Sequence, residues 1–94
     1  MRFEWDEFKR RAVKRKHGID LAEVPRIFLR LYVEDFDLSH SSSEDRWRAL
    51  GLPGDRVVVV IYAHRGDAIR LISARYAEPH EEQKYFEEAF GEPW

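Results

Sequence analysis

Three arginines recur at intervals of five residues, and their chemistry suits phosphate. Arg65, Arg70 and Arg75 lie in a segment whose other members are mostly apolar. A guanidinium presents a planar fork of N–H donors that matches phosphate oxygens. The alternative is pairing with carboxylates of the C-terminal helix, such as Glu78, Glu81 or Glu82, because an unpaired buried charge is costly. In a regular strand Arg70 and Arg75 point to opposite faces, unless a bulge turns one of them.

The other chemically active side chains give weaker signals. His17, His40, His64 and His80 match no metal-binding spacing, and the chain has no cysteine, so we expect no bound metal. Ser73 lies in a strand-like segment without an obvious base, which favours a structural hydroxyl. Phosphate-binding loops, dinucleotide fingerprints and nucleophile elbows are missing from the sequence.

Length and composition favour one small protein domain that spans residues 1–94. The chain has 94 residues, of which 36% are charged and 14% are aromatic. The absence of cysteine excludes a disulfide scaffold. Neither a membrane-spanning apolar run nor a signal peptide is recognisable, so we expect a cytoplasmic protein without a membrane partner.

The formal net charge of −2 conceals four blocks of alternating sign. Residues 1–30 carry nine basic and five acidic side chains, and residues 31–55 carry two and six. Residues 56–77 carry four basic and one acidic side chain, and residues 78–94 carry one and six. Folding can bring the two basic blocks together in a patch that the average hides. The alternative is a charged surface without a partner.

The N-terminal part is predicted to form a short strand and two helices. After a strand at residues 3–5, Asp6 is placed to cap a helix at residues 7–16, on which Phe8 and Ala12 form a thin apolar face. Asp20 starts the second helix, although Pro25 makes that helix irregular.

The rest of the chain is predicted to form four strands and a last helix. The strands are expected at residues 31–38, 46–52, 56–63 and 68–75, with a polar loop at 39–45 and a hairpin turn at 64–67. The valine-rich strand at 56–63 is apolar on both faces, which is typical of the middle of a sheet. A helix at 79–90 ends the order β-α-α-β-β-β-β-α, and short turns favour a mostly antiparallel sheet.

Several short motifs together resemble the BrnT family of toxins. The N-terminal motifs are Phe3-Glu4-Trp5-Asp6, Lys9 and Lys16-His17-Gly18. The C-terminal motifs are Arg70-Leu71-Ile72-Ser73-Ala74-Arg75, Ala77, Glu81 and Tyr85. The valine-rich strand, Tyr62 and the turn Arg65-Gly66-Asp67 are also similar to the family. The motifs span nearly the whole chain in the family's order.

The resemblance implies a bacterial ribonuclease toxin of a type II toxin–antitoxin system. Its fold would be α+β and RelE-like, an antiparallel sheet with two N-terminal helices packed on it and a short C-terminal helix. The implied activity is metal-independent RNA cleavage that inhibits translation and needs no cofactor. The implied partner is a BrnA-type antitoxin, with two toxins binding two antitoxins. The toxin would reach operator DNA only through the antitoxin.

The resemblance also implies a reaction and its residues. The RNA 2′-hydroxyl would attack the adjacent phosphate, leaving a 2′,3′-cyclic phosphate and a 5′-hydroxyl end. Residues that stabilise charge or move protons in this reaction would be Arg65, Arg70, Arg75, His17, Glu81 and Tyr85. Residues that hold the RNA would be Lys9, Lys16 and Tyr62.

Three of these residues have equally good structural roles. His17 could end the first helix, Glu81 could orient an arginine, and Tyr85 could pack on the sheet. The chain departs from the family pattern at Val13 and Lys14, at Val24-Pro25, and in being slightly acidic. Two other function classes therefore stay open, a weak or inactive toxin-like module that mainly binds antitoxin and a nucleic-acid-binding regulator.

Overall fold

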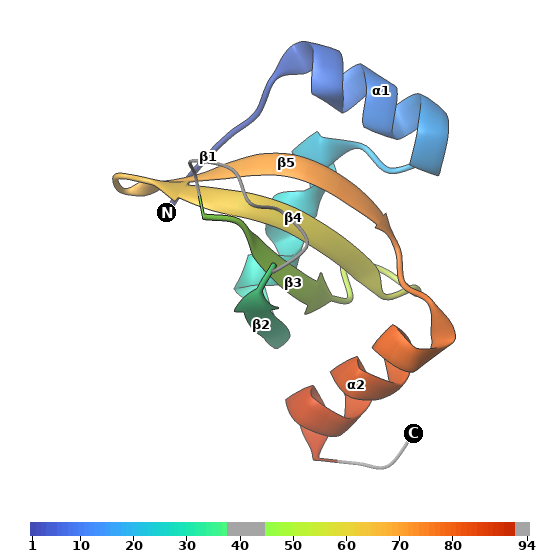
Figure 1. Ribbon diagram of the computed structural model, residues 1–94. Coiled ribbons are helices and arrows are strands. Elements are labelled where there is room, and N and C mark those ends of the chain that lie inside the picture. Colours follow the sequence, from blue (N-terminus) through green and yellow to red (C-terminus); the bar gives the residue numbers. More distant parts are fainter. Residues whose placement is uncertain (38–44, 92–94) are drawn as a thin grey trace.

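The computed structural model describes residues 1–37 and 45–91 (Figure 1). Its elements in chain order are β1 (Arg2–Glu4), α1 (Glu7–His17), the 3-10 helix η1 (Leu21–Leu29), β2 (Tyr32–Phe36), β3 (Trp47–Gly51), β4 (Val58–Arg65), β5 (Ala68–Tyr76) and α2 (Pro79–Phe90). These elements confirm the predicted α+β class and the short C-terminal helix. Apart from Asp45, the loop predicted at residues 39–45, with His40, lies outside the described residues.

The five strands form one sheet in the order β1-β5-β4-β3-β2. Strands β2 to β5 run antiparallel to their neighbours, but β1 pairs in parallel with β5. The mostly antiparallel sheet that the short turns predicted is therefore confirmed, while β1 departs from the antiparallel sheet that the family resemblance implied. A hairpin turn forces two strands to run antiparallel, whereas β1 and β5 are connected only through the intervening chain.

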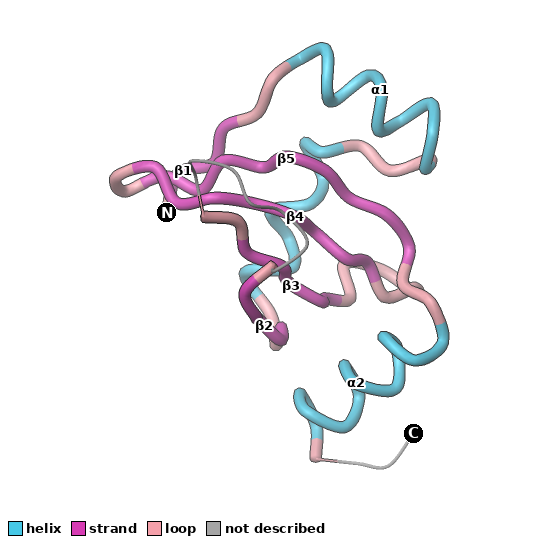
Figure 2. Tube along the Cα trace, in the orientation of Figure 1, coloured by secondary structure: helices cyan, strands magenta, loops and turns pink. Residues whose placement is uncertain are grey.

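The hairpin between β4 and β5 lies within the predicted turn at residues 64–67. Its two central residues are Gly66 and Asp67, and Figure 2 draws a short loop between the two strands. Gly66 has a φ of 59°, which glycine adopts at no steric cost and which two-residue hairpin turns require. This turn fixes the β4–β5 register from which the candidate site is built.

The second N-terminal helix is a 3-10 helix and not the predicted α-helix. The predicted order β-α-α-β-β-β-β-α is therefore wrong at its third element. Asp20 caps the helix as predicted, but Pro25 in its middle has no N–H to donate to a helical hydrogen bond. The buried residues Leu21, Val24 and Ile27 repeat every three positions, which is the period of a 3-10 helix.

Helix α1 begins and ends at the predicted signals. The Asp6 carboxylate accepts two backbone N–H groups of the first turn, at 2.7 and 3.3 Å. Gly18 ends the helix with a φ of 75°. Both caps satisfy backbone groups that a helix end leaves without partners.

The predicted apolar face of α1 is wrong. Phe8 is 79% exposed, Ala12 is also exposed, and Val13 is the buried residue of the helix. Trp5 and Ile19, which flank α1 in sequence, belong to the same core cluster as Val13. Because both ends of α1 are attached through these two residues, the helix turns Val13 inward and leaves Phe8 outside.

The two faces of the sheet are covered by different helices, which lie at opposite ends of the molecule in Figure 1. We call the face that carries Val58 and Val60 the α1 face, because α1 and η1 pack on it. The opposite face carries Val59 and Leu50, and we call it the α2 face. Helix α2 contacts β2 and β3 on this face. Within residues 1–37 and 45–91, no helix has both the length and the apolar composition to cross a membrane.

Candidate active site

A bulge in β5 brings the three predicted arginines to one face of the sheet. Ile61 pairs with Ser73 and Tyr62 pairs with Leu71, so Ile72 is an extra residue in β5. Partners across a sheet share a face, and alternate residues of a strand share a face. Beyond the bulge the alternation in β5 is therefore reversed. The spacing of Arg70 and Arg75 left two possibilities open, opposite faces in a regular strand or one face across a bulge, and β5 contains the bulge.

The register then places each arginine on the α2 face. Arg75 pairs with Val59, Arg70 pairs with Ala63, and Arg65 follows two residues after Ala63 in β4. Since Val59, Ala63 and Arg65 are an even number of residues apart, all three arginines lie on one face. The α2 face therefore carries a row of three arginines. Neither the spacing of the arginines in the sequence nor the composition of the chain predicts this row.

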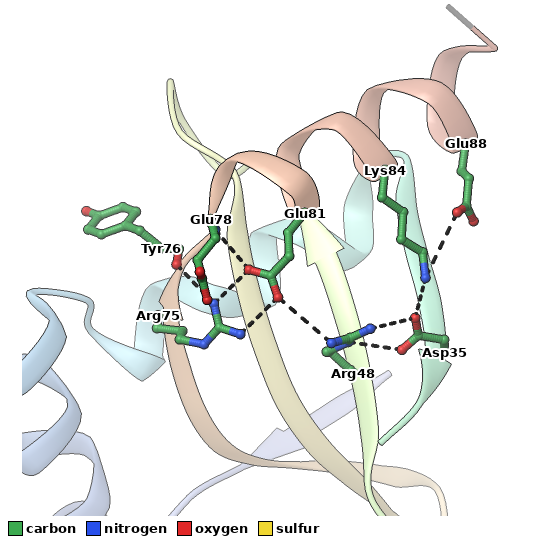
Figure 3. A network of polar contacts seen from close by, with 8 residues as sticks. All are labelled: Asp35, Arg48, Arg75, Tyr76, Glu78, Glu81, Lys84 and Glu88. Carbon is green, nitrogen blue, oxygen red and sulfur yellow. Dashed lines mark hydrogen bonds and ion pairs between the residues drawn. The ribbon is translucent and has the colours of Figure 1, made fainter. Parts of the chain in front are cut away.

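Arg75 is held by Glu81 of α2 through two parallel hydrogen bonds of 2.8 and 2.9 Å (Figure 3). The Glu81 carboxylate also accepts the backbone N–H of Glu78 at 2.9 Å, and its side chain is 6% exposed. The hydrogen bonds from Arg75 lower the pKa of Glu81 from 4.5 to about 2, although burial acts in the opposite direction. Glu81 is therefore ionised at neutral pH and orients Arg75, which is the alternative that the sequence left open.

A fourth arginine, Arg48 of β3, joins this network. Its guanidinium donates two hydrogen bonds to Asp35 of β2, at 3.1 and 3.0 Å, and lies 3.8 Å from a Glu81 oxygen. Lys84 of α2 donates to the same Asp35 at 2.6 Å. Figure 3 shows the resulting chain of contacts from β5 across β3 to β2, with α2 above it. These contacts fix the position of α2 on the sheet.

Arg70 is less engaged than Arg48 or Arg75. Its guanidinium makes one ion pair, with Glu4 of β1 at 3.6 Å, and its side chain is 31% exposed. Arg65 is exposed at the end of β4, beside the hairpin turn. Arg70 can therefore turn to an external phosphate more readily than Arg48 or Arg75.

The two predicted tyrosines are buried. Tyr62 lies on the α1 face and its hydroxyl donates to Glu34 of β2. The Tyr85 hydroxyl donates to the backbone oxygen of Leu31 at 3.1 Å. Burial raises the pKa of both phenols, and for Tyr62 the hydrogen bond to Glu34 raises it further. The Tyr62 hydroxyl thus ties the edge strand β2 to β4, and the Tyr85 hydroxyl ties α2 to Leu31, directly before β2.

The remaining predicted residues belong to α1, on the other side of the sheet. Lys9 and Lys16 are exposed, and His17 is partly exposed in the last turn of the helix. The structure therefore places Arg65, Arg70 and Arg75 on one face of the sheet, with Glu81 in contact with Arg75, and separates them from His17, Lys9 and Lys16. In the described part of the chain, no three His, Cys, Asp or Glu side chains are grouped to hold a metal ion.

Sequence reasoning missed Arg48, Asp35 and Lys84. One signal was available, since Arg48 is a charged residue in a strand that continues with the buried Ala49 and Leu50. Such a charge needs a partner. The partner itself could not be read from the sequence, because the pairing of residue 35 with residue 48 depends on the β2–β3 register.

Comparison with known proteins gives one family. A family model described as a ribonuclease toxin, BrnT, of type II toxin-antitoxin system matches residues 5–81. A search of curated proteins finds no match. The matched segment runs from Trp5 to Glu81. It therefore contains the arginines of the α2 face and the carboxylate that holds Arg75.

Proposed function

Because this chain belongs to the BrnT family of ribonuclease toxins of type II toxin–antitoxin systems, we propose that it cuts RNA without a metal ion and so inhibits translation. The observation that carries the proposal is the bulge at Ile72, which aligns Arg70 with Arg75 on the α2 face. We extend the proposal to the fold, in which the sheet and its N-terminal helices correspond to the RelE-like arrangement that the family resemblance implies.

The proposed phosphate site lies over the row formed by Ser73, Ile61 and Arg48. These residues are partners across β5, β4 and β3. Arg70 is on the α2 face on one side of this row and Arg75 on the other. A phosphate over the row would therefore meet three guanidiniums, placed where negative charge develops as the 2′-oxygen attacks.

In this proposal some residues of the site bind the phosphate, and others hold the binding residues in position. Arg70 contacts the phosphate, while Arg75 and Arg48 are held in fixed orientations by Glu81 and Asp35. With a pKa of about 2, Glu81 carries no proton at neutral pH that it could donate to the leaving 5′-oxygen. Glu81 is therefore a positioning residue in this proposal.

The other predicted catalytic residues take structural roles in the proposal. His17 lies in the last turn of α1, where a cation suits the negative end of the helix dipole. The Tyr62 hydroxyl holds β2, and the Tyr85 hydroxyl holds Leu31, directly before β2. Arg65, exposed at the hairpin, extends the cationic row along the path of the RNA.

Membership of a type II toxin–antitoxin family implies an antitoxin partner. We propose a BrnA-type antitoxin, two copies of which bind two toxins and carry them to operator DNA. The exposed Glu87 and Glu88 of α2 suit a basic segment of such a partner. A second candidate function, a weak toxin whose main role is antitoxin binding, is favoured by the carboxylates that already neutralise Arg48 and Arg75.

The test is RNA cleavage by the purified protein in EDTA, with analysis of the product ends. We expect cyclic-phosphate ends, and a rate about 10²–10³-fold lower for Arg70→Ala. The matched control is Arg26→Ala, which removes an exposed arginine paired with Glu23 on η1 and should cleave like the wild type. Cleavage by Arg70→Ala at the wild-type rate would contradict the proposed site.

A second measurement separates the two candidate functions. Expression without antitoxin should arrest growth if the chain is an active toxin. Normal growth and no cleavage, together with tight binding of the antitoxin, would instead support the binding module.

A further inference from the structure

Most of the cations of α1 have no carboxylate partner in the described part of the chain. Within residues 1–37 and 45–91, five exposed cations of this helix form no ion pair: Lys9, Arg11, Lys14, Arg15 and Lys16. The one exception in the helix is Arg10, which binds Asp20 at 2.7 Å and Glu7 at 3.4 Å. Elsewhere the arginines that line the sheet are paired, as Arg70 and Arg75 show.

An exposed aromatic ring lies among these cations. Phe8 is 79% exposed, and the Arg11 guanidinium lies 5.3 Å from the centre of its ring. Phe8, Arg11 and Arg15 are three and four residues apart, so they form one stripe along the outside of the helix. The stripe thus combines one flat apolar surface with cations that no internal carboxylate neutralises.

Such a stripe matches single-stranded nucleic acid more closely than an acidic peptide. Exposed cations attract the phosphate backbone. A base can stack on an aromatic ring or on a guanidinium plane, whatever its identity. An acidic peptide would use the cations of the helix but would leave the Phe8 ring without a role.

We propose that the outer surface of α1, formed by Phe8, Arg11, Arg15 and the neighbouring lysines, is a second RNA-binding site. Its ligand is the backbone of single-stranded RNA, with one base stacked on Phe8. The site lies on the α1 side of the sheet, opposite the arginines of the α2 face (Figure 1). This proposal rests on the proposed ribonuclease function in one respect, because the RNA that binds α1 is taken to be the RNA that the protein cuts.

The site has a consequence for RNA length. Since the sheet separates α1 from the arginines of the α2 face, only a strand long enough to pass around the sheet reaches both. Long RNA therefore uses both surfaces, whereas a short RNA uses one surface at a time. Loss of the α1 surface should weaken the binding of long RNA and leave the turnover of short RNA unchanged.

The experiment measures binding of a long oligouridine by the full chain at several salt concentrations. Arg11→Gln with Arg15→Gln should reduce the slope of log affinity against log salt by about 1.4, at about 0.7 for each phosphate contact in single strands. Phe8→Ala should weaken binding about tenfold without changing the slope. The control pair Arg2→Gln with Arg26→Gln removes the same charge from exposed but ion-paired arginines and should not change the slope.

Three results would overturn the proposal. One is an unchanged slope in the variant that lacks Arg11 and Arg15, and another is an equal change in the control pair. The third is loss of antitoxin binding by that variant while its RNA binding is retained, which would assign the surface to the antitoxin. Binding is measured apart from cleavage, so RNA binding that depends on α1 in a protein without cleavage activity would keep this proposal and contradict the proposed function.

Discussion

Replacement of Glu81 by glutamine tests whether this carboxylate holds α2 and the arginines in place. Glutamine keeps an oxygen that can accept the backbone N–H of Glu78, so the helix start is preserved. The substitution removes the negative charge that faces Arg75 at 2.8 Å and Arg48 at 3.8 Å. Both guanidiniums then lose a charged partner whose own side chain is almost fully buried.

The size of the effect follows from the pKa of Glu81. Its value falls from 4.5 to about 2 because Arg75 and the Glu78 N–H bind the ionised form. At about 1.4 kcal/mol for each pKa unit, this difference corresponds to about 3 kcal/mol. That stabilisation is fully present above pH 4.5 and is lost as the pH falls from 4.5 toward 2. The loss is a large part of the roughly 5–15 kcal/mol that stabilises a typical domain.

The assay is urea unfolding of the wild type and of Glu81→Gln at neutral and acidic pH. We expect Glu81→Gln to be less stable by about 3 kcal/mol at pH 7, with a difference that shrinks as the pH approaches the pKa of Glu81. The control is Glu82→Gln, which changes a neighbouring carboxylate of the same helix for which no arginine contact is described. A difference at pH 7 no larger than that of the control, or one that stays constant in acid, would refute the reasoning.

Two further substitutions test the packing that supports the site. Gly51→Ala would bring a methyl group 2.5 Å from the Cβ of Ile27. It should therefore destabilise the protein by about 1–3 kcal/mol in thermal unfolding, whereas Gly54→Ala, where the added Cβ meets nothing within 4 Å, should not. Tyr85→Phe removes the hydroxyl that donates to the backbone oxygen of Leu31 and should cost about 0.5–1.5 kcal/mol, the net contribution of a typical hydrogen bond; an unchanged melting temperature would contradict that contact.

Local signals predicted the element boundaries well where a side chain or glycine determines the backbone. Asp6 and Gly18 set the ends of α1, and Gly66 sets the hairpin turn. Helix type was harder, because the apolar period of residues 21–31 fits both a 3-10 and an α-helix. Pro25 was the one local sign of an irregular helix. The close packing of Ile27 against Gly51 of β3 depends on the fold, and the narrower 3-10 helix accommodates it.

The candidate site depended on features that a sequence does not encode locally. The interval between Arg70 and Arg75 showed that the two could share a face only across a bulge, but its position at Ile72 depends on the β4–β5 pairing. The contact of Arg48 with Asp35 depends likewise on the register of β2 and β3. Sequence patterns therefore predicted which residues carry charge, while the register decided which charges meet.

The two basic blocks of the sequence meet different surroundings in the fold, which the net charge of −2 does not display. Two arginines of residues 56–77 turn toward carboxylates, since Arg75 meets Glu81 and Arg70 meets Glu4. The cations of α1 face outward, and of these Arg10 alone is described with a carboxylate partner. The paired arginines of the sheet are fixed in orientation as hydrogen-bond donors. The unpaired cations of α1 instead attract phosphate groups over a longer range. A net charge of −2 is thus compatible with RNA as a partner, because affinity depends on the unpaired cations of one surface and not on the sum over the chain.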